Sequence, residues 1–445
     1  MSSTARTVNV GLIGLGTVGG GVARVILRHR DEYLSAYGID LRIKRACALE
    51  PERARELGLP DEAFTSDWHD VVADPNIDIV IELIGGDHPA TEIFEAALTS
   101  GKHVVSANKA LLGRHVERLG RLAAQHHVQI RCEAAAGGGI PIVNALEHAL
   151  VGNEILTVAG ILNGTTNYIL TRMEREGLDF AEVLADAQRL GYAEADPTAD
   201  VDGFDAASKV AILSSIAFHT RITTDDVFQE GIRNVSAADI EQARSLGYTV
   251  KLLGIARNTA DGVDVRVHPT MIPTDHMLAS VSGAMNAVYV VGDAVGETMF
   301  YGAGAGSFPT ASAVVGDVLE LADAISHTPG PKAEIEPFDR VLPLRSIDDL
   351  VTRYYVRLVV VDEVGTLLPI MDVFARHGIS ISQINQLQDG DGSRCSVVFL
   401  THKAAEGDMA AARQELDELA AVEQVASVIR IEDVASWAEG AEENE

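Results

Sequence analysis

The segment Gly14-Leu15-Gly16-Thr17-Val18-Gly19 decides the fold, because it fits the pattern G-x-G-x-x-G of a phosphate-binding turn. The short apolar run Val8 to Leu15 precedes it, and Val18 to His29 repeats apolar residues at helical spacing. This order predicts a strand, a turn and a helix, in which absent side chains let backbone N–H groups approach a pyrophosphate. An ordinary tight turn would have the same pattern, but the flanking elements favour a dinucleotide site. We assign that site to Gly14, Leu15, Gly16, Thr17, Val18 and Gly19.

Three more strand-like runs follow, at Ile39 to Leu49, Ile77 to Leu83 and Lys102 to Ser106, with helical segments between them. Strands that alternate with helices imply an α/β fold with a Rossmann-like, doubly wound parallel sheet. From about Ala135 the pattern changes to glycine-rich turns and long amphipathic helices. We therefore predict that a mixed α+β domain comes next, with strands near 157–162 and 263–271.

A third domain is predicted near the C-terminus. Pro329, Pro331 and Pro337 lie among charged residues in a stretch whose composition suits a linker. Beyond it, the strand and helix signals follow the order βαββαβ of a ferredoxin-like unit. The strands are expected at 354–361, 379–387, 395–400 and 425–431, the helices at 367–377 and 409–419, and a turn at 389–392.

These signals divide the chain into five segments. They are a dinucleotide-binding domain at 1–134, rejoined by about 302–327; a mixed domain at 135–301; a linker at 328–352; the βαββαβ domain at 353–433; and an acidic tail at 434–445. We expect the tail to be disordered after Trp437.

Composition excludes several classes of partner. The 445 residues carry a formal net charge of -30, which repels nucleic acid and anionic membranes, so we expect neither as a partner. No apolar run is long enough to span a bilayer, and Met1 to Thr7 shows no secretion signal. The three cysteines are odd in number and far apart, which suits a reducing cytoplasm.

The end of the second predicted strand bears on the choice between NAD and NADP. Glu50 could accept a hydrogen bond from the ribose 2′-OH of NAD and would repel the 2′-phosphate of NADP. Arg45, Arg53 and Arg55 lie close in sequence and would favour the opposite choice. The sequence favours NAD modestly and leaves NADP open.

Lys109 follows a predicted buried strand, at the carboxyl edge of the sheet where ligands of such folds bind. A lysine there can polarise a bound oxygen. The alternative is a surface lysine that begins a helix, but arginine supplies most of the positive charge elsewhere in this chain.

Glu133 precedes three glycines and a proline, at Gly137 to Gly139 and Pro141. Several carbonyl groups could therefore turn inward beside one carboxylate, an oxygen-only ligand set that suits a hard cation. A flexible hinge between domains explains the same residues equally well.

Two polar turns also allow two interpretations each. Asn163-Gly164-Thr165-Thr166-Asn167 could bind a polar substrate, although capping of the following helix is the safer interpretation. The glycine-rich turn Tyr301 to Ser307, which contains Gly306, could bind an anion or allow close packing.

The densest group of charged residues begins at Gly191-Tyr192 and includes Glu194, Asp196, Asp200, Asp202, Asp205 and Lys209. Asp205 and Lys209 are four residues apart, so on a helix they would share one face and form a pair. A solvated acidic loop is the alternative in so acidic a chain. One lysine among five carboxylates favours a functional site.

Taken together, these motifs resemble those of homoserine dehydrogenase over roughly residues 8 to 325, and residues 354 to 432 look like an ACT domain. The resemblance implies reversible, nicotinamide-dependent reduction of L-aspartate 4-semialdehyde to L-homoserine, on the route to threonine, methionine and isoleucine. It implies that the second domain is catalytic and dimerising. By this analogy Lys209 donates the proton, Asp205 pairs with it, and Lys109 lies between cofactor and substrate.

The resemblance assigns further roles. Glu194 and Asp200 would hold the amino end of the substrate, Thr165 would line its pocket, and Gly306 would return a backbone group to the cofactor. Glu133 with the carbonyls of Ala136, Gly138 and Ile140 corresponds to a sodium site in the family. Many relatives have an arginine before the acid of the second strand where this chain has Leu49, which puts NADP in doubt. A homo-oligomer, dimer or tetramer, and a threonine effector at the ACT domain are also expected.

Two rival functions fit the sequence less well. A phosphorylating semialdehyde dehydrogenase needs a nucleophilic cysteine, and none of the three lies in a glycine-rich turn between strand and helix. An amino-acid sensor without turnover would not need Lys109, Asp205 and Lys209 together.

Overall fold

The structure is a computed structural model that describes residues 6–327, 340–388 and 394–438. The predicted turn at 389–392, the first part of the predicted linker and the tail from residue 439 lie outside these residues. Among the described helices, none is both long and apolar enough to cross a membrane.

Sheet A confirms the predicted Rossmann-like fold. Its six parallel strands lie in the order β3-β2-β1-β4-β5-β6, in which the chain winds outward from β1 in both directions. The strands are β1 (Arg6–Ile13), β2 (Ile39–Cys47), β3 (Phe64–Thr65), β4 (Ile79–Glu82), β5 (His103–Ser106) and β6 (Ile130–Arg131). The connecting helices are α1 (Thr17–Tyr37), α2 (Pro51–Glu56), α3 (His69–Val72), α4 (Ala90–Thr99) and α5 (Lys109–Gln125).

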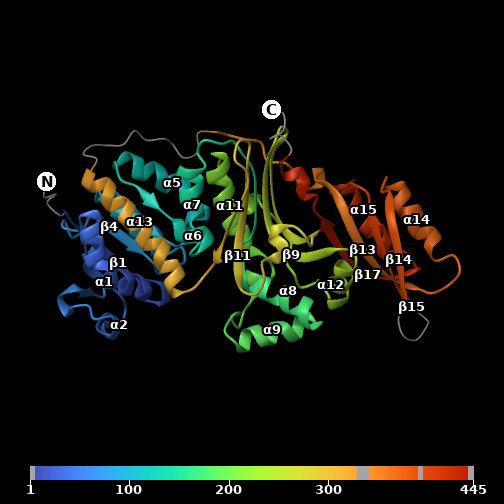
Figure 1. Cartoon of the computed structure of the whole chain (residues 1–445), viewed down its shortest axis with the longest axis horizontal. Helices are drawn as coiled ribbons and strands as arrows, with labels where there is room; N and C mark the ends of the chain where they lie inside the picture. Colours follow the sequence, from blue (N-terminus) through green and yellow to red (C-terminus); the bar gives the residue numbers. More distant parts are fainter. Residues whose placement is uncertain (1–5, 328–339, 389–393, 439–445) are drawn as a thin grey trace.

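Helix α13 (Ser307–His327) brings a late part of the chain back to sheet A, where Figure 1 shows it beside α1. Its apolar residues Ala311, Val314 and Val318 are buried in one core with Val10 and Val22 of β1 and α1. The turn before α13 therefore lies next to the glycine loop that begins α1.

Sheet B is a mixed sheet of eleven strands whose main path is β12-β11-β7-β9-β10-β17-β13-β15-β14. Helices α8 (Gly164–Glu176), α11 (Phe204–Phe218) and α12 (Ala237–Ser245) pack against it. Short helices α6 (Glu133–Gly137) and α7 (Ile142–Asn144) precede it, and α9 (Phe180–Arg189) and α10 (Thr198–Val201) lie between α8 and α11. The strands from the middle of the chain are β7 (Ile155–Ile161), β8 (Phe228–Gln229), β9 (Tyr248–Thr259), β10 (Gly262–Pro273), β11 (Met285–Gly292) and β12 (Gly296–Ala303).

The C-terminal unit has the predicted order βαββαβ, and its four main strands lie in the order β17-β13-β15-β14. They are β13 (Val351–Val361), β14 (Ile381–Gln388), β15 (Arg394–Thr401) and β17 (Val422–Ile431), with helices α14 (Leu367–Arg376) and α15 (Glu406–Asp417) and the short strand β16 (Ala404–Ala405). Helices α14 and α15 share an apolar core with these strands.

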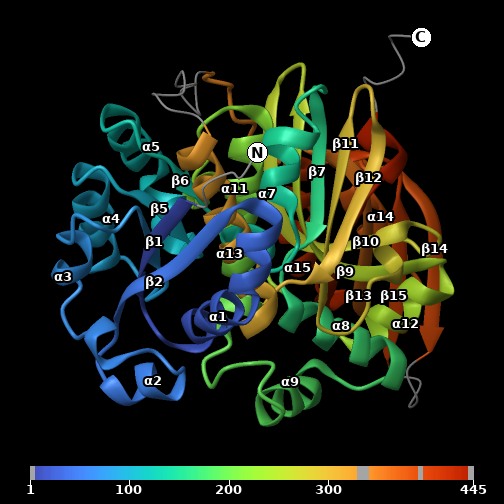
Figure 2. The same ribbon diagram turned by 60° about the vertical axis from the view of Figure 1, so that its left-hand side comes forward.

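The C-terminal unit does not stand apart from the middle of the chain. Strand β17 pairs in parallel with β10, with Thr270 opposite Arg430 and Met271 opposite Ile431, so one sheet runs through both. Figure 2 shows β13, β14 and β15 of the C-terminal unit on the same side of the molecule as β9 and β10, in keeping with the strand order. This continuity was not predicted from the sequence.

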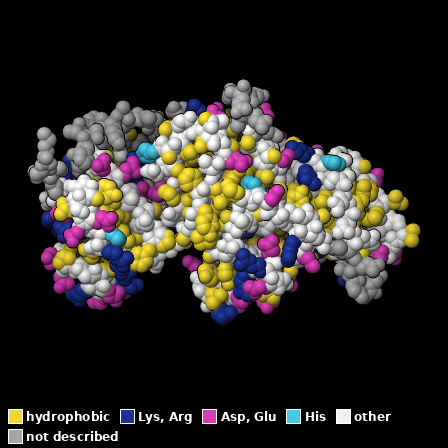
Figure 3. Space-filling model, viewed as in Figure 1, with side chains coloured by type: hydrophobic (Ala, Val, Ile, Leu, Met, Phe, Trp, Pro, Cys, Tyr) yellow, Lys and Arg dark blue, Asp and Glu magenta, His cyan; other side chains and the backbone are white. Residues whose placement is uncertain are grey.

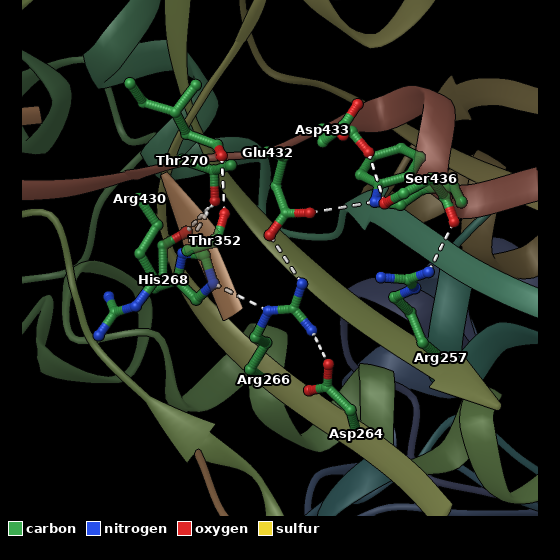
Figure 4. A network of polar contacts seen from close by, with 12 residues as sticks. Arg257, Asp264, Arg266, His268, Thr270, Thr352, Arg430, Glu432, Asp433 and Ser436 are labelled. Carbon is green, nitrogen blue, oxygen red and sulfur yellow. Dashed lines mark hydrogen bonds and ion pairs between the residues drawn. The ribbon is translucent and has the colours of Figure 1, made fainter. Parts of the chain in front are cut away.

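A buried polar network closes the seam between β10 and β17 (Figure 4). Arg266 lies inside the protein, where its guanidinium contacts Asp264, donates to Glu432 at 2.7 Å and donates to His268 at 3.2 Å. Burial, aided by the nearby charges of Arg430 and Arg266, lowers the pKa of His268, so its ring stays neutral and can accept this bond. The two carboxylates compensate the buried guanidinium.

The segment assigned to the acidic tail begins with an ordered turn at Val434–Ala438. Trp437 is buried there, against Tyr289 of β11 and His276. Its indole N–H donates to Glu432 at 3.1 Å, and its carbonyl accepts from Thr157 of β7 at 2.9 Å. The chain thus returns from the C-terminal unit to the middle sheet.

Candidate active site

Asp205 is the centre of the candidate active site. It lies in the first turn of α11 and is buried. One carboxylate oxygen accepts from the Nζ of Lys109 at the start of α5, and the other accepts from the Nζ of Lys209 at 2.8 Å. Because α5 flanks sheet A and α11 covers sheet B, the cluster joins the two halves of the molecule (Figure 1).

The two lysines set the charge state of this carboxyl group. Burial alone would raise the pKa of Asp205, but the ammonium groups of Lys209 and Lys109 outweigh it and hold that pKa well below its usual range. Asp205 is therefore ionised at neutral pH, and it fixes the position of both lysines.

The part of the chain that the structure describes supplies two hydrogen-bond acceptors to Lys209, which leaves one of its N–H groups for another partner. Its Nζ donates to the carbonyl of Leu162 at 2.7 Å and to Asp205 at 2.8 Å, and an ammonium group has three N–H donors. Its side chain is buried. The Nζ of Lys209 is therefore held in place by two hydrogen bonds and can donate one more.

Asn163 braces the cluster from the turn before α8. Its side-chain amide donates to Asp205 at 2.9 Å and to Asp200 at 2.7 Å, while its amide oxygen accepts from the backbone N–H of Thr166 at 2.8 Å. The capping interpretation of this turn is confirmed. The same side chain also holds two of the predicted site carboxylates.

The remaining predicted substrate residues lie around this brace. Thr165 donates from its hydroxyl to the carbonyl of Tyr192 at 2.8 Å, which ties α8 to the acidic loop. Glu194 is exposed on that loop. The structure thus brings together Lys109, Lys209, Asp205 and Asp200, and leaves Glu194 at the surface nearby.

The glycine loop has the form that a dinucleotide needs. Gly14 has φ +98°, and a side chain there would meet the backbone oxygen of Leu83 at 2.7 Å. A side chain on Gly19 would lie 1.8 Å from the oxygen of Gly14, whereas one on Gly16 would meet nothing within 4 Å. The loop is thus closely packed behind and open in front, at the N-terminus of a 21-residue helix without a side-chain cap.

Gly306 and Glu50 are the other two residues, outside the glycine loop and Lys109, that were predicted to bind the cofactor. Gly306 has φ +122° and precedes α13, whose first residue, Ser307, donates from its hydroxyl to the carbonyl of Thr17 at 2.7 Å. Glu50 is exposed just before α2. The turn at Gly306 therefore lies beside the glycine loop.

Glu82, the last residue of β4, was not predicted to belong to the site. It is completely buried, and its carboxylate accepts from the backbone of Ile84 at 2.8 Å and from the hydroxyl of Ser106 at 2.9 Å. The side chain of Asn108, which caps α5, also donates to it at 3.4 Å. The presence of an acid at the end of an apolar strand could have identified Glu82 from the sequence. Through Asn108, Glu82 contacts the start of α5, where Lys109 lies.

Glu133, the carboxylate of the predicted cation site, is buried at the start of α6. Its carboxylate accepts from the backbone N–H groups of Val143 at 2.9 Å and Asn144 at 2.7 Å. Burial raises its pKa despite these bonds. Among the described residues no group of three His, Cys, Asp or Glu side chains is placed to hold a metal.

Comparisons with known proteins cover nearly the whole chain. A family model for "Homoserine dehydrogenase, NAD binding domain" matches residues 14–133, and one for "Homoserine dehydrogenase" matches residues 141–319. The homoserine dehydrogenase of Synechocystis sp. is 45% identical over 96% of this chain and 99% of its own length. The structure of a homoserine dehydrogenase from Thiobacillus denitrificans is 42% identical, with a TM-score of 0.91 over 96% of this chain and 99% of that one. A hyperthermophilic archaeal homoserine dehydrogenase in complex with NADPH is 26% identical, with a TM-score of 0.62 over 74% of this chain and 100% of that one.

The Rossmann-like sheet with its glycine loop and the lysine–carboxylate cluster at its edge define an NAD(P)-dependent oxidoreductase. The chain belongs to the homoserine dehydrogenase family. It catalyses the reversible, nicotinamide-dependent interconversion of L-aspartate 4-semialdehyde and L-homoserine, in the aspartate pathway.

Proposed function

We propose that the cluster of Lys109, Asp205 and Lys209 carries out the proton transfer of this reaction. The bound nicotinamide supplies a hydride to the aldehyde carbon. The oxygen of the aldehyde must then gain a proton, and the one free N–H of Lys209 can donate it. In the opposite direction the neutral amine of Lys209 would accept the hydroxyl proton of homoserine, and the oxidised nicotinamide would be the acceptor of the hydride.

Asp205 and Lys109 orient the ammonium group of Lys209 and set the charge around it. Asp205 fixes Lys209 through one oxygen and Lys109 through the other, so the two ammonium groups approach the same carboxylate from the two halves of the molecule. Lys109 is nearly half exposed and lies at the edge of sheet A, where the nicotinamide would enter. This arrangement of two lysines on one buried carboxylate carries the proposal.

The amino end of the substrate is proposed to bind at Asp200 and Glu194. The side-chain amide of Asn163 donates to both Asp200 and Asp205, so these two carboxylates lie on either side of it. Glu194 lies on the loop that Thr165 connects to α8. Carboxylates near the proposed proton donor suit the ammonium group of an amino-aldehyde.

The glycine loop and Gly306 are proposed to hold the pyrophosphate and the nicotinamide end of the cofactor. Support comes from the open space in front of Gly16 and from the archaeal relative, which is in complex with NADPH. A sodium ion is proposed at Glu133 with the carbonyls of Ala136, Gly138 and Ile140. A buried carboxyl group of raised pKa is a position where a hard cation would be stabilising.

The C-terminal unit is proposed to be an ACT domain that binds threonine as an effector. A pocket opens at the turn after β13, and its polar walls include Asp362, Glu363, Thr366 and Gln386. Carboxylates suit the ammonium end of a small amino acid, whereas the amide of Gln386 and the hydroxyl of Thr366 can donate to its carboxylate end. Regulation through this pocket would act on the same continuous sheet that carries the catalytic half.

A homo-oligomer is proposed, with the end of sheet B near β12 at the interface. Strand β12 is the last on its side of the sheet, and its Tyr301 is largely exposed. Figure 3 shows hydrophobic side chains gathered over the central strands. Exposed apolar surface of this kind favours association.

Replacement of Lys209 tests the proposed chemistry. Lys209→Met keeps the length of the side chain but removes the proton, so we expect kcat with homoserine to fall by about 10² or more. The affinity for the dinucleotide, measured by fluorescence titration, should change less than about threefold. Lys251→Met, which removes a buried lysine of β9, is the matched control. Undiminished turnover in Lys209→Met would exclude this residue as the donor.

A further inference from the structure

The side-chain amide of Asn163 uses all of its hydrogen-bonding capacity. It is buried at the turn between β7 and α8. An asparagine amide has two N–H donors and an oxygen with two lone pairs. The donors bond Asp205 at 2.9 Å and Asp200 at 2.7 Å, and the oxygen accepts from the backbone N–H of Thr166 at 2.8 Å and from its hydroxyl at 3.0 Å. The amide therefore cannot turn without the loss of several of these bonds.

The carboxylate of Asp200 depends on this amide for its position. Within residues 6–327, 340–388 and 394–438, Asn163 supplies the hydrogen bond that this carboxylate accepts, and no ion pair of Asp200 is present. The neighbouring Asp202 is held in a different way, by an ion pair with Arg233. Asp200 is partly exposed, so its second oxygen can meet a ligand.

The amide also fixes the distance between two carboxylates. The two N–H groups of one amide diverge by about 120°, so the oxygens of Asp200 and Asp205 that accept from Asn163 lie about 5 Å apart. Two negative charges at this distance repel each other, and the N–H groups between them offset the repulsion. Asp205 in turn holds the Nζ of Lys209 at 2.8 Å. Asn163 therefore sets how far Asp200 lies from the proposed proton donor.

The substrate has one group for each end of this spacing. Its ammonium group is proposed to bind at Asp200, and its reacting oxygen is proposed to meet Lys209. In homoserine three carbon atoms separate the nitrogen from this oxygen, which places the two atoms about 5 Å apart when the chain is extended. Serine is one methylene shorter, and 5-hydroxynorvaline is one methylene longer.

We propose that Asn163 is a positioning residue that determines the chain length of the substrate, because it keeps the amino-end site and the proton donor at the separation that homoserine spans. This role rests on the proposed functions of Asp200 and Lys209. A shorter amino alcohol cannot reach both ends, and a longer one must bend to fit between them. In either case the reacting oxygen is misplaced, and both proton and hydride transfer become slow.

Three amino alcohols that differ by single methylene groups test this role. Serine, homoserine and 5-hydroxynorvaline share the amino-acid group and the terminal hydroxyl. We expect the unaltered protein to prefer homoserine over each of the other two by about 10² in kcat/KM. Isothermal titration gives the three affinities as a second readout, with the enzyme loaded with the reduced dinucleotide, which cannot accept a hydride from the alcohol.

Two substitutions of Asn163 remove the spacing but keep the cap of α8. Serine and aspartate both accept from the backbone N–H of Thr166, but neither can donate to both carboxylates. We expect Asn163→Ser to lower kcat/KM with homoserine by about 10² and to reduce the preference over 5-hydroxynorvaline to less than about tenfold. Asn163→Asp adds a third negative charge that drives Asp200 and Asp205 apart, so it should move the preference further toward the longer substrate.

Two matched variants separate spacing from charge and from stability. Asp200→Asn keeps an acceptor for Asn163 but removes the charge, so it should weaken the three ligands by a similar factor of about ten. Ser236→Ala removes the cap of α12, a helix that packs against the same sheet as α8. It should lower the unfolding temperature and leave the preference for homoserine unchanged.

Three results would overturn the inference: an unchanged preference in Asn163→Ser, an equal loss with all three substrates in that variant, or a changed preference in Ser236→Ala. Failure of the proposed function has different signs. Homoserine affinity that did not change in Asp200→Asn would refute the amino-end site, and undiminished turnover in Lys209→Met would refute the proton donor. An unchanged preference in Asn163→Ser, with both of those roles confirmed, would refute the spacing alone.

Discussion

At the scale of single residues, Asp317 of α13 is a carboxyl group in an environment that disfavours its charge. Burial raises its pKa to about 8, and the nearby carboxylate of Glu133 adds to the effect, although the backbone N–H of Glu133 donates to it at 2.9 Å. Glu320 also opposes its ionisation and Arg131 favours it. At pH values between the ordinary aspartate pKa and about 8, Asp317 is therefore protonated in the folded protein and ionised in the unfolded chain.

This proton makes the stability fall as the pH rises. Between the ordinary aspartate pKa of about 4 and the folded value of about 8, the unfolded state binds fewer protons than the folded state, so unfolding becomes easier. Asp317→Asn keeps the shape without the charge, and we expect its advantage in urea unfolding over the unaltered protein to grow from pH 5 to pH 8. Asp275→Asn, at an exposed site, should show no such trend. A constant difference across this range would contradict the prediction.

Glu82 should act on the reaction through Lys109. Its carboxylate joins the end of β4 to Ser106 and Asn108, and Asn108 caps the helix that Lys109 begins. We expect Glu82→Ala to lower kcat by more than tenfold because Lys109 loses its fixed position. Glu82→Gln retains acceptors for the backbone of Ile84 and should restore most of kcat. If both variants lost activity equally while both unfolded at the temperature of the unaltered protein, positioning would not be the explanation.

At the scale of helices and strands, the seam between β10 and β17 contains a buried cluster of charged side chains. Arg266 is buried with Asp264 and Glu432 as its partners, so removal of one carboxylate leaves an incompletely compensated charge in the interior. Glu432→Gln should lower the free energy of unfolding by about 3–5 kcal/mol. Asp372→Asn, which breaks an exposed pair with Arg376, should change it by less than about 1 kcal/mol. Urea titration of both variants measures the two changes in the free energy of unfolding. Equal changes would show that burial does not decide how much an ion pair stabilises the protein.

Local patterns predicted the elements that lie close in sequence to their partners. The glycine loop with its flanking strand and helix identified sheet A, and the alternation of strands and helices identified the βαββαβ unit. Strand β9 was missed because eight of its first nine residues are buried, so the alternation of apolar and polar residues that marks a half-exposed strand is absent. Strands β11 and β12 were missed as well.

Contacts between distant segments could not be predicted from periodicity. The pairing of Thr270 with Arg430 joins residues that no local pattern connects, and the burial of Trp437 follows from that pairing. In the site, the spacing of Asp205 and Lys209 predicted their pair, but the contact of Lys109 with the same carboxylate needed the fold.

At the scale of the whole molecule, the continuous sheet B makes the C-terminal unit part of the catalytic half. A chain that ends at Arg340 would lack β17, Glu432 and Trp437, which leaves Arg266 without one partner and exposes the end of β10. We therefore expect this truncated chain to aggregate or unfold at a lower temperature, rather than to yield an active enzyme without regulation. Calorimetry and light scattering of the two chains measure this. A truncated chain that remained monodisperse, with unchanged kcat and unfolding temperature, would contradict it.

The pairing of β10 with β17 also has a consequence for synthesis of the chain on the ribosome. The part of β10 around Thr270 emerges about 150 residues before β17 does, and at roughly 5–20 residues per second the wait is of the order of ten to thirty seconds. During that time the half-built sheet presents an open edge to neighbouring nascent chains. Slow translation of the last hundred codons would therefore be expected to cost this enzyme yield, and a chaperone that shields strand edges would be expected to restore it.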